Sequence, residues 1–344
     1  TELTRRGMPG VWTHGFYTGW AANYLIWMAN NRNSIGRFYE TFGNSVPDTK
    51  ERKLQKRQTS REWYRPNPPL EKVMWSFRNN TNYMESGVLT ALNYVATHGK
   101  RFLENFYIKS KKSIERGKTE KPHAYVIPRD QRRKVATAHL INLLRLQGVE
   151  VHQADQKLTW EVKAKPSKAA TNGKAKKEEK ARRLSAPKGS YVVRLDQPYR
   201  TLAQILLDRQ NFPQNANPPY DDTGWSLPLL HQVEVKKVDD PAILQARMHL
   251  VSEDVRLHGQ LLNKGRAFYI VNNTTENEFA ALRFKLADVS MQAAEEPFTV
   301  GKRSFAAGSY IVPAKGNPAD LADRLEKLAA ETGLDIVGVK KRPE

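Results

Sequence analysis

The first side chain in this sequence with a setting for chemistry is the carboxylate of Glu40. It stands in the run SIGRFYETFGN between Phe38 and Phe42, and the composition of this run predicts a strand over residues 34–44. Alternation along a strand places Glu40 and both Phe side chains on one face. Burial of an unpaired carboxylate is costly, so Glu40 should either pair with a cation or act as a general base or acid. The residues alone leave both roles open.

Two guanidinium groups near Glu40 extend this candidate site. Arg32 and Arg37 could meet a substrate carboxylate, because a guanidinium donates two parallel hydrogen bonds to it, although ordinary salt bridges are the simpler explanation. Aromatic side chains precede them at helical spacing and predict a helix from about residue 20 to 30. Such a stripe is typical of a core, and the alternative is the wall of a substrate pocket. The aromatic residues are Trp12, Phe16, Trp20, Tyr24 and Trp27.

Other chemistries find little support in the sequence. Cysteine is absent, which excludes disulfides, thiolate zinc sites and a cysteine nucleophile. No glycine-rich nucleotide motif and no G-x-S-x-G elbow occurs. A His-x-x-Glu pair, His231 to Glu234, stands in a run that predicts a solvent-facing strand, and so short a pattern is common by chance. Asp221 and Asp222 lie among turn-forming residues, which favours a role in bending the backbone.

The net charge of +20 raises the possibility of a nucleic-acid binder. However, the segment 163–188 holds ten Lys or Arg against two Glu, and its Ala-, Lys- and Pro-rich composition cannot bury a core. The basic runs 50–57 and 109–118 lack interleaved aromatic residues for base stacking and are typical of solvated faces. We therefore expect no nucleic-acid partner. No apolar stretch is long enough for a membrane span.

The strongest internal signal is a repeat. From His123 the sequence predicts a strand, a helix ending at Gly148, a second strand and the run GSYVV, and the segment 266–312 follows the same order to GSYIV. Tyr125 and Gly189 are 64 positions apart, whereas Tyr269 and Gly308 are 39 apart. The difference of 25 nearly matches the basic segment, which is therefore an insertion at a hairpin tip of the first copy. Because helices alternate with strands, we expect a mostly parallel sheet.

A resemblance to a known family enters at the front of the chain. The stretch GMPGVWTHGFYTGWAANYLIWMANNRNSIGRFYETFGN resembles the end of the catalytic domain in bacterial zinc carboxypeptidase-like proteins of the M14 peptidase family. The later runs YRPNPPL, ESGVLTALNYVATH, QPYRTLAQILLDRQ and YDDTGW are similar to segments that follow this domain in large members. The resemblance implies that Glu40 is the glutamate that polarises a zinc-bound water, and that Tyr17 borders the substrate. It also implies zinc ligands that precede this chain.

These observations predict an α/β chain in four segments. Residues 1–48 close a carboxypeptidase-like catalytic domain, 49–120 form a linker and long helix, 121–240 are the first accessory repeat and 241–344 the second. We expect part of a zinc metallocarboxypeptidase that takes peptide substrates, inactive alone, from an exported or periplasmic parent protein. The chain starts at Thr1 without a signal segment, which favours a piece of a longer protein. The alternative is a non-catalytic accessory or binding module, and the residues do not predict an oligomeric state.

Overall fold

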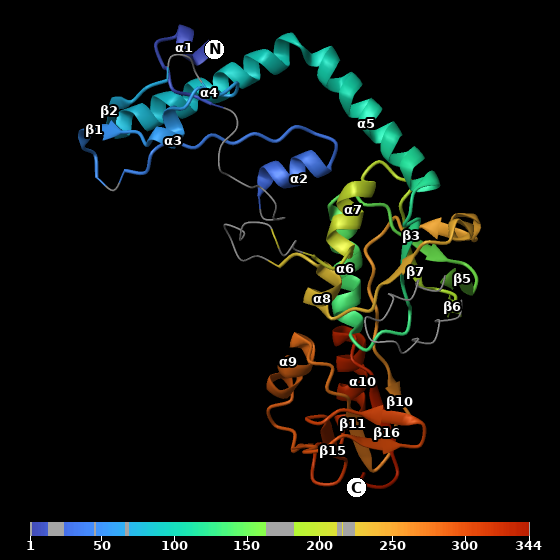
Figure 1. Cartoon of the computed structure of the whole chain (residues 1–344). Helices are drawn as coiled ribbons and strands as arrows, with labels where there is room; N and C mark the ends of the chain where they lie inside the picture. Colours follow the sequence, from blue (N-terminus) through green and yellow to red (C-terminus); the bar gives the residue numbers. More distant parts are fainter. Residues whose placement is uncertain are drawn as a thin grey trace, which may run out of the picture. The chain divides into compact units, whose positions relative to one another are not determined.

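Helices and strands are mixed along the described chain, as predicted for an α/β protein (Figure 1). Contacts within the chain divide it into two units: unit 1 holds residues 1–112 and 211–225, and unit 2 holds residues 113–210 and 226–344. The boundaries predicted at residues 48, 120 and 240 remain predictions. The computed structural model describes residues 2–12, 24–44, 46–65, 69–162, 182–211, 215 and 224–343.

Unit 1 is built around a two-stranded antiparallel ribbon and a long helix. Trp75 on the ribbon is only 6% exposed, and its Nε1 donates a hydrogen bond to Asn80 Oδ1 at 2.7 Å. The long helix begins after Ser76, whose backbone N–H donates to Asn79 Oδ1 at 3.0 Å, an N-terminal cap. The elements are α1 (Glu2–Arg5), α2 (Leu25–Asn31), β1 (Thr49–Lys53), α3 (Lys56–Thr59), β2 (Lys72–Ser76), α4 (Phe77–Thr97) and α5 (Gly99–Thr119), the last ending in unit 2.

The first half of unit 2 is a five-stranded sheet with strand order β8-β3-β7-β4-β9. A two-stranded hairpin, β5 with β6, follows β4 along the chain. Helices connect β3 to β4 and β7 to β8. The elements are β3 (Ala124–Ile127), α6 (Lys134–Leu146), β4 (His152–Ala154), β5 (Leu158–Val162), β6 (Arg182–Ala186), β7 (Tyr191–Arg194), α7 (Arg200–Leu207), α8 (Leu227–His231), β8 (Lys236–Val238), η1 (Pro241–Gln245) and β9 (Met248–Leu250).

The second half of unit 2 is another five-stranded sheet, with strand order β10-β16-β11-β15-β12. Its own hairpin, β13 with β14, lies between β12 and β15 in the chain. The connecting helices are α9 and α10, and α10 ends at Gly333, which has a φ of +74° and so takes the left-handed cap that glycine favours. The elements are β10 (Leu261–Leu262), β11 (Phe268–Val271), α9 (Asn277–Lys285), β12 (Gln292–Ala293), β13 (Phe298–Val300), β14 (Arg303–Phe305), β15 (Tyr310–Pro313), α10 (Leu321–Thr332) and β16 (Ile336–Val339).

The prediction of a mostly parallel sheet is wrong. Among the described strands, every hydrogen-bonded pair is antiparallel except β10 with β16. The helix-linked strands β3 and β4 do run parallel, but β7 lies between them and is antiparallel to both. This is the split βαβ arrangement. Alternating strands and helices predict the direction of the linked strands, and they do not reveal which strand is inserted between them.

Equivalent turns close both sheets ahead of β7 and β15. Gly189 and Gly308 have φ of +85° and +79°, a region open to glycine because it has no Cβ. The next residue in each case is a fully buried serine whose hydroxyl accepts a backbone hydrogen bond. Ser190 accepts from the Arg129 N–H at 3.1 Å, and Ser309 accepts from the Asn273 N–H at 3.0 Å. The GSY runs therefore tie β7 and β15 to the loops that follow β3 and β11.

Each sheet carries its own apolar core. In the first, Trp160 of the hairpin packs with strand residues such as Val126 and Val192, and all three are at most 1% exposed. In the second, Tyr269 packs with Leu325 of α10. In α6, Leu140 and Leu144 are fully buried, and in α10, Leu321 and Leu328 belong to the second core. No helix in the described part of the chain combines the length and apolar character that crossing a membrane requires.

Candidate functional site

Glu40 lies on an extended segment that is not part of a sheet. The strand predicted over residues 34–44 is absent among the described residues, and the Glu40 side chain is exposed. The premise that this carboxylate is buried between two Phe rings is therefore wrong. Glu40 makes no ion pair with any residue that the structure describes.

Side chains of α4 and of the β1–β2 ribbon hold the Glu40 segment in place, although the segment does not pair with the ribbon as a third strand. A Cβ on Gly87 would lie 2.8 Å from the Tyr39 ring, so this glycine lets the ring approach the helix. Asn80 Nδ2 donates to the Phe42 carbonyl oxygen at 2.9 Å, and the Phe42 ring meets Trp75 edge-on with 5.0 Å between centroids. Phe38 stays 46% exposed. Neighbouring side chains therefore still point in different directions, as in a strand: Tyr39 toward α4 and Glu40 toward solvent.

The two arginines proposed for a substrate carboxylate have different settings. Arg37 is exposed, and its guanidinium lies 5.7 Å from the centroid of the Tyr39 ring, within the range of a cation–π contact. Arg32 caps the C-terminus of α2, where its backbone N–H donates to the Met28 carbonyl oxygen at 3.2 Å. Tyr17, the second catalytic candidate, lies outside the described residues.

The His-x-x-Glu pair is divided between two structural settings. His231 ends α8, and its carbonyl oxygen accepts a hydrogen bond from Arg133 Nη1 at 2.9 Å. Burial, with the positive charge of Arg133 and the neighbouring His139, lowers the pKa of His231. Glu234 is exposed and pairs with Lys236 at 3.5 Å. Within the described ranges, no three His, Asp or Glu side chains come together as a metal site, so these residues do not form a site that fits zinc.

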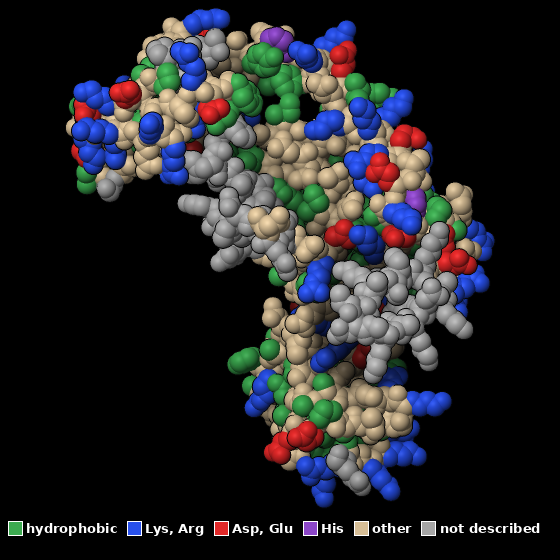
Figure 2. Space-filling view, in the orientation of Figure 1, with side chains coloured by type: hydrophobic (Ala, Val, Ile, Leu, Met, Phe, Trp, Pro, Cys, Tyr) green, Lys and Arg blue, Asp and Glu red, His purple; other side chains and the backbone are tan. Residues whose placement is uncertain are grey.

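Basic side chains gather over the β1–β2 ribbon, as the space-filling view shows (Figure 2). They are exposed, as expected for a solvated face, and several have local partners. Lys50 pairs with Asp48 at 2.7 Å, and Lys72 pairs with Glu51 at 3.2 Å across the ribbon. Exposed pairs of this kind contribute about 0–1 kcal/mol each. Residues 163–181, the core of the basic insert, lie outside the described residues, as do Asp221 and Asp222.

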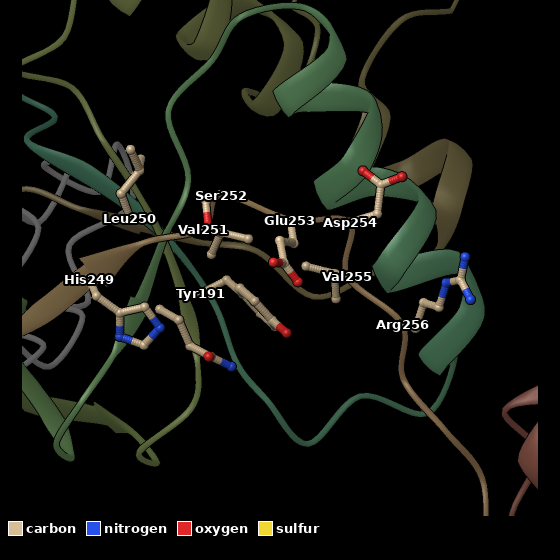
Figure 3. A pocket seen from close by; sticks show the side chains of 10 residues that line it. Tyr191, His249, Leu250, Val251, Ser252, Glu253, Asp254, Val255 and Arg256 are labelled. Atoms are coloured by element: carbon tan, nitrogen blue, oxygen red, sulfur yellow. The ribbon is translucent and has the colours of Figure 1, made fainter.

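A hollow of about 330 Å³ lies at the β7–β4–β9 end of the first sheet. Tyr191, His249 and Glu253 turn their side chains toward it (Figure 3). His249 Nδ1 lies 2.8 Å from Asp155 Oδ1. A carboxylate that contacts Nδ1 orients the imidazole ring. We call this hollow the acid–base pocket.

Charge and burial set the protonation of groups around the acid–base pocket. Burial raises the pKa of the Tyr191 hydroxyl, and the nearby Arg129 guanidinium opposes this in part. Burial lowers the pKa of His152, and the Arg194 charge lowers it further. Tyr191 and His152 are therefore neutral at pH 7. The His249 side chain remains 59% exposed, so the pocket lacks the enclosure of a catalytic centre.

Sequence reasoning missed the acid–base pocket because its groups are far apart in the chain. Asp155 and His249 are 94 positions apart and meet only because β4 pairs with β9. The short β9 strand carries no periodic signal in the sequence. Comparison with family models, with curated proteins and with solved structures finds no match to this chain.

Proposed function

We propose that the chain is part of a zinc carboxypeptidase-like hydrolase of the M14 type that cleaves C-terminal peptide bonds. The single observation that carries the proposal is the likeness of residues 7–44 to the end of that catalytic domain. By the same resemblance, the zinc ligands would come from residues of a parent protein that precede this stretch. This chain alone would then be inactive.

In this proposal Glu40 is the proton acceptor of the hydrolysis. Its carboxylate is exposed and outside every ion pair of the described chain, so a cleft completed by preceding residues has access to it. A carboxylate enclosed in such a cleft acquires a higher pKa, which suits a general base near neutral pH. Arg37, three residues away, would meet the substrate carboxylate, with Arg32 as the other candidate and Tyr17 at the border of the substrate site.

Unit 2 would be the non-catalytic accessory part of the same protein, made of two copies of one strand-helix-strand-hairpin-strand-helix-strand unit. Strand order supports the duplication, since β8-β3-β7-β4 corresponds to β16-β11-β15-β12. Register supports it as well: Tyr125 faces Val193 across one sheet, and Tyr269 faces Val312 across the other. The hydrogen bonds of Ser190 and Ser309 correspond in the same way.

The basic insert also fits this duplication. Val162 and Arg182 face each other at the open end of the β5–β6 hairpin, with residues 163–181 between them in the chain. In the second copy the equivalent pair is Val300 and Arg303, which a two-residue turn joins. Lengthening such a turn costs about 0.6 kcal/mol for each doubling of its length, because closure entropy grows with the logarithm of length. The insert then has no necessary role in the accessory unit.

The proposal is tested on the longer parent protein. We expect it to contain zinc and to release the last residue from peptides with a free C-terminal carboxylate, and to leave peptides with an amidated C-terminus uncut. The same assay on the 344-residue chain should show no hydrolysis. A parent protein that binds no zinc and cleaves neither peptide would contradict the proposal. The alternative, a non-catalytic accessory or binding module, would then remain.

A further inference from the structure

A second hollow in unit 2 lies where its two sheets adjoin, and none of the functions considered so far uses it. It has a volume of 180 Å³ and is lined by the loops that follow β3 and β11 and by the residues ahead of β16. This is below the roughly 300–1,000 Å³ of pockets for drug-sized ligands, so any ligand must be small. We call it the junction pocket. Its polar side chains are Gln131, Arg132, Lys134, Asn272, Thr274, Glu276 and Asp335.

The walls of the junction pocket are held by hydrogen bonds between the two halves of unit 2. Glu276 is only 4% exposed, and one of its carboxylate oxygens accepts the Ala136 N–H at 2.9 Å in the first turn of α6. Lys134 pairs with Asp335 at 2.7 Å. Arg132 Nη2 donates to the Asn273 carbonyl oxygen at 2.6 Å. The pocket is therefore preorganised, which reduces the entropy lost when a ligand binds.

One buried group in the junction pocket has no partner. Thr274 is 8% exposed, and its hydroxyl makes no hydrogen bond with any residue in the described chain. A buried hydroxyl without a partner costs about 1–3 kcal/mol, so it is normally found bonded to protein, water or a ligand. The hydroxyl can both donate and accept, and Thr274 lines the pocket together with Glu276.

The charges of the junction pocket select the class of ligand. Lys134 and Asp335 neutralise each other, which leaves one guanidinium, Arg132, and one carboxylate, Glu276. A metal cation is disfavoured by the two basic side chains, and a plain anion is disfavoured by the two acidic ones. A small molecule that carries both charges matches both groups. Leu334 is the apolar contribution to the lining, which leaves little room for a large side chain.

We propose that the junction pocket binds a small free α-amino acid. Its carboxylate accepts hydrogen bonds from the Arg132 guanidinium, and its ammonium group donates to the second oxygen of Glu276 and to the Thr274 hydroxyl. This ligand satisfies the buried hydroxyl and spans loops from both halves of unit 2. The proposal concerns unit 2 alone and does not depend on Glu40 or on the peptidase assignment.

The test is calorimetric titration of the 344-residue chain with L-alanine, with acetate and ethylamine as separate single-charge probes and L-tryptophan as the large one. Alanine should bind, and the other three should bind at least about ten-fold more weakly, because each loses a charge-assisted hydrogen bond or clashes with the wall. Arg132→Ala should weaken alanine binding by a similar factor. Arg256→Ala, in the acid–base pocket, is the matched control and should leave it unchanged.

A second variant separates binding from folding. Thr274→Val keeps the shape of the side chain and removes the unpartnered hydroxyl, so it should raise the melting temperature of the ligand-free chain while weakening alanine binding. The proposal is overturned if alanine at millimolar concentration gives no heat with the folded chain, which leaves a pocket filled by water. It is also overturned if acetate or ethylamine binds as tightly as alanine, or if Arg256→Ala abolishes binding that Thr274→Val retains.

Discussion

At the scale of single residues, buried polar groups contribute more to the stability of this fold than exposed charges do. Ser190 and Ser309 are both fully buried, and each hydroxyl satisfies a backbone N–H at the end of a strand. Neither serine is assigned a role from the sequence, where the two GSY runs serve only as markers of the repeat. Their function is structural, and the cost of losing them is therefore a test of the fold.

Replacement of either serine by alanine should destabilise the protein. Ser190→Ala leaves the Arg129 N–H without its partner, which costs about 1–3 kcal/mol. Ser309→Ala should cost at least as much, because that hydroxyl also donates to the Ala306 carbonyl oxygen at 2.7 Å. Urea denaturation gives the free energy of unfolding. Ser185→Ala, at an exposed position of β6, is the control and should change it by less than about 0.5 kcal/mol.

At the scale of elements, close approach between backbones fixes where helices lie. Gly117, near the end of α5, packs so tightly that an added Cβ would lie 1.9 Å from the Leu195 carbonyl oxygen. Gly99 starts the same helix, and an added Cβ there meets nothing within 4 Å. The two glycines lie in the same helix, and they differ in whether other atoms lie where a Cβ would be added.

Gly117→Ala and Gly99→Ala should therefore act in opposite directions. At Gly117 the backbone has to move, and overpacking of this kind costs about 1–3 kcal/mol. At Gly99 alanine should be neutral or stabilise the helix by up to about 1 kcal/mol. Thermal unfolding followed by circular dichroism compares them. Equal effects of the two substitutions would show that the contact between α5 and the end of β7 is not tight.

A pair of ionic hydrogen bonds links helix α10 to Asp288, in the loop after α9. Two Arg324 guanidinium nitrogens donate to the two carboxylate oxygens of Asp288 at 2.7 Å each. These bonds lower the pKa of Asp288 from 3.8 to about 2. A depressed carboxyl pKa stabilises the folded state above the pKa of the unfolded chain, and the contribution disappears as the pH falls through the folded value.

The stability advantage of the native protein over Asp288→Asn should thus be present at pH 5 and fade between about pH 4 and pH 2. Chemical denaturation at several pH values measures the difference. Asp254→Asn, in an exposed single contact with Arg145, serves as the comparison and should give a smaller change. An advantage of native Asp288 that persists undiminished at pH 2 would contradict the account of this pair.

At the scale of the whole molecule, the sequence predicted the order of strands and helices in unit 2, but it did not predict how the strands pair, and the strand predicted over residues 34–44 is absent from the described residues. The elements from β3 to β7 and from β11 to β16 follow the predicted order, because apolar periodicity is a local property. Strand direction between neighbours depends on contacts far apart in the chain, so the parallel sheet was wrong. The burial expected for Glu40 is absent for a related reason: the side chain that packs on α4 is Tyr39, next to Gly87, and this contact joins residues far apart in the chain.

The basic insert gives a prediction at this scale. Replacing residues 163–181 by Gly-Lys, the turn of the second hairpin, should preserve the fold and raise the free energy of unfolding by up to about 2 kcal/mol, because a shorter loop closes at a lower entropic cost. Melting temperature and a DNA-binding assay at low and high salt check it. Loss of folding would contradict the proposal that the insert is dispensable. Salt-sensitive DNA binding that survives the replacement would contradict the expectation that the chain has no nucleic-acid partner.

The most direct measurement of the central claim is the rate of C-terminal residue release by the parent protein with Glu40→Gln. Glutamine keeps the size of the side chain and cannot accept the proton, so kcat should fall by about 10²–10⁴-fold while the fold and zinc content are unchanged. The control is Glu85→Gln, at an exposed glutamate of α4, which should retain the native rate. Native activity in the Glu40→Gln protein would remove this carboxylate from the reaction and contradict the account.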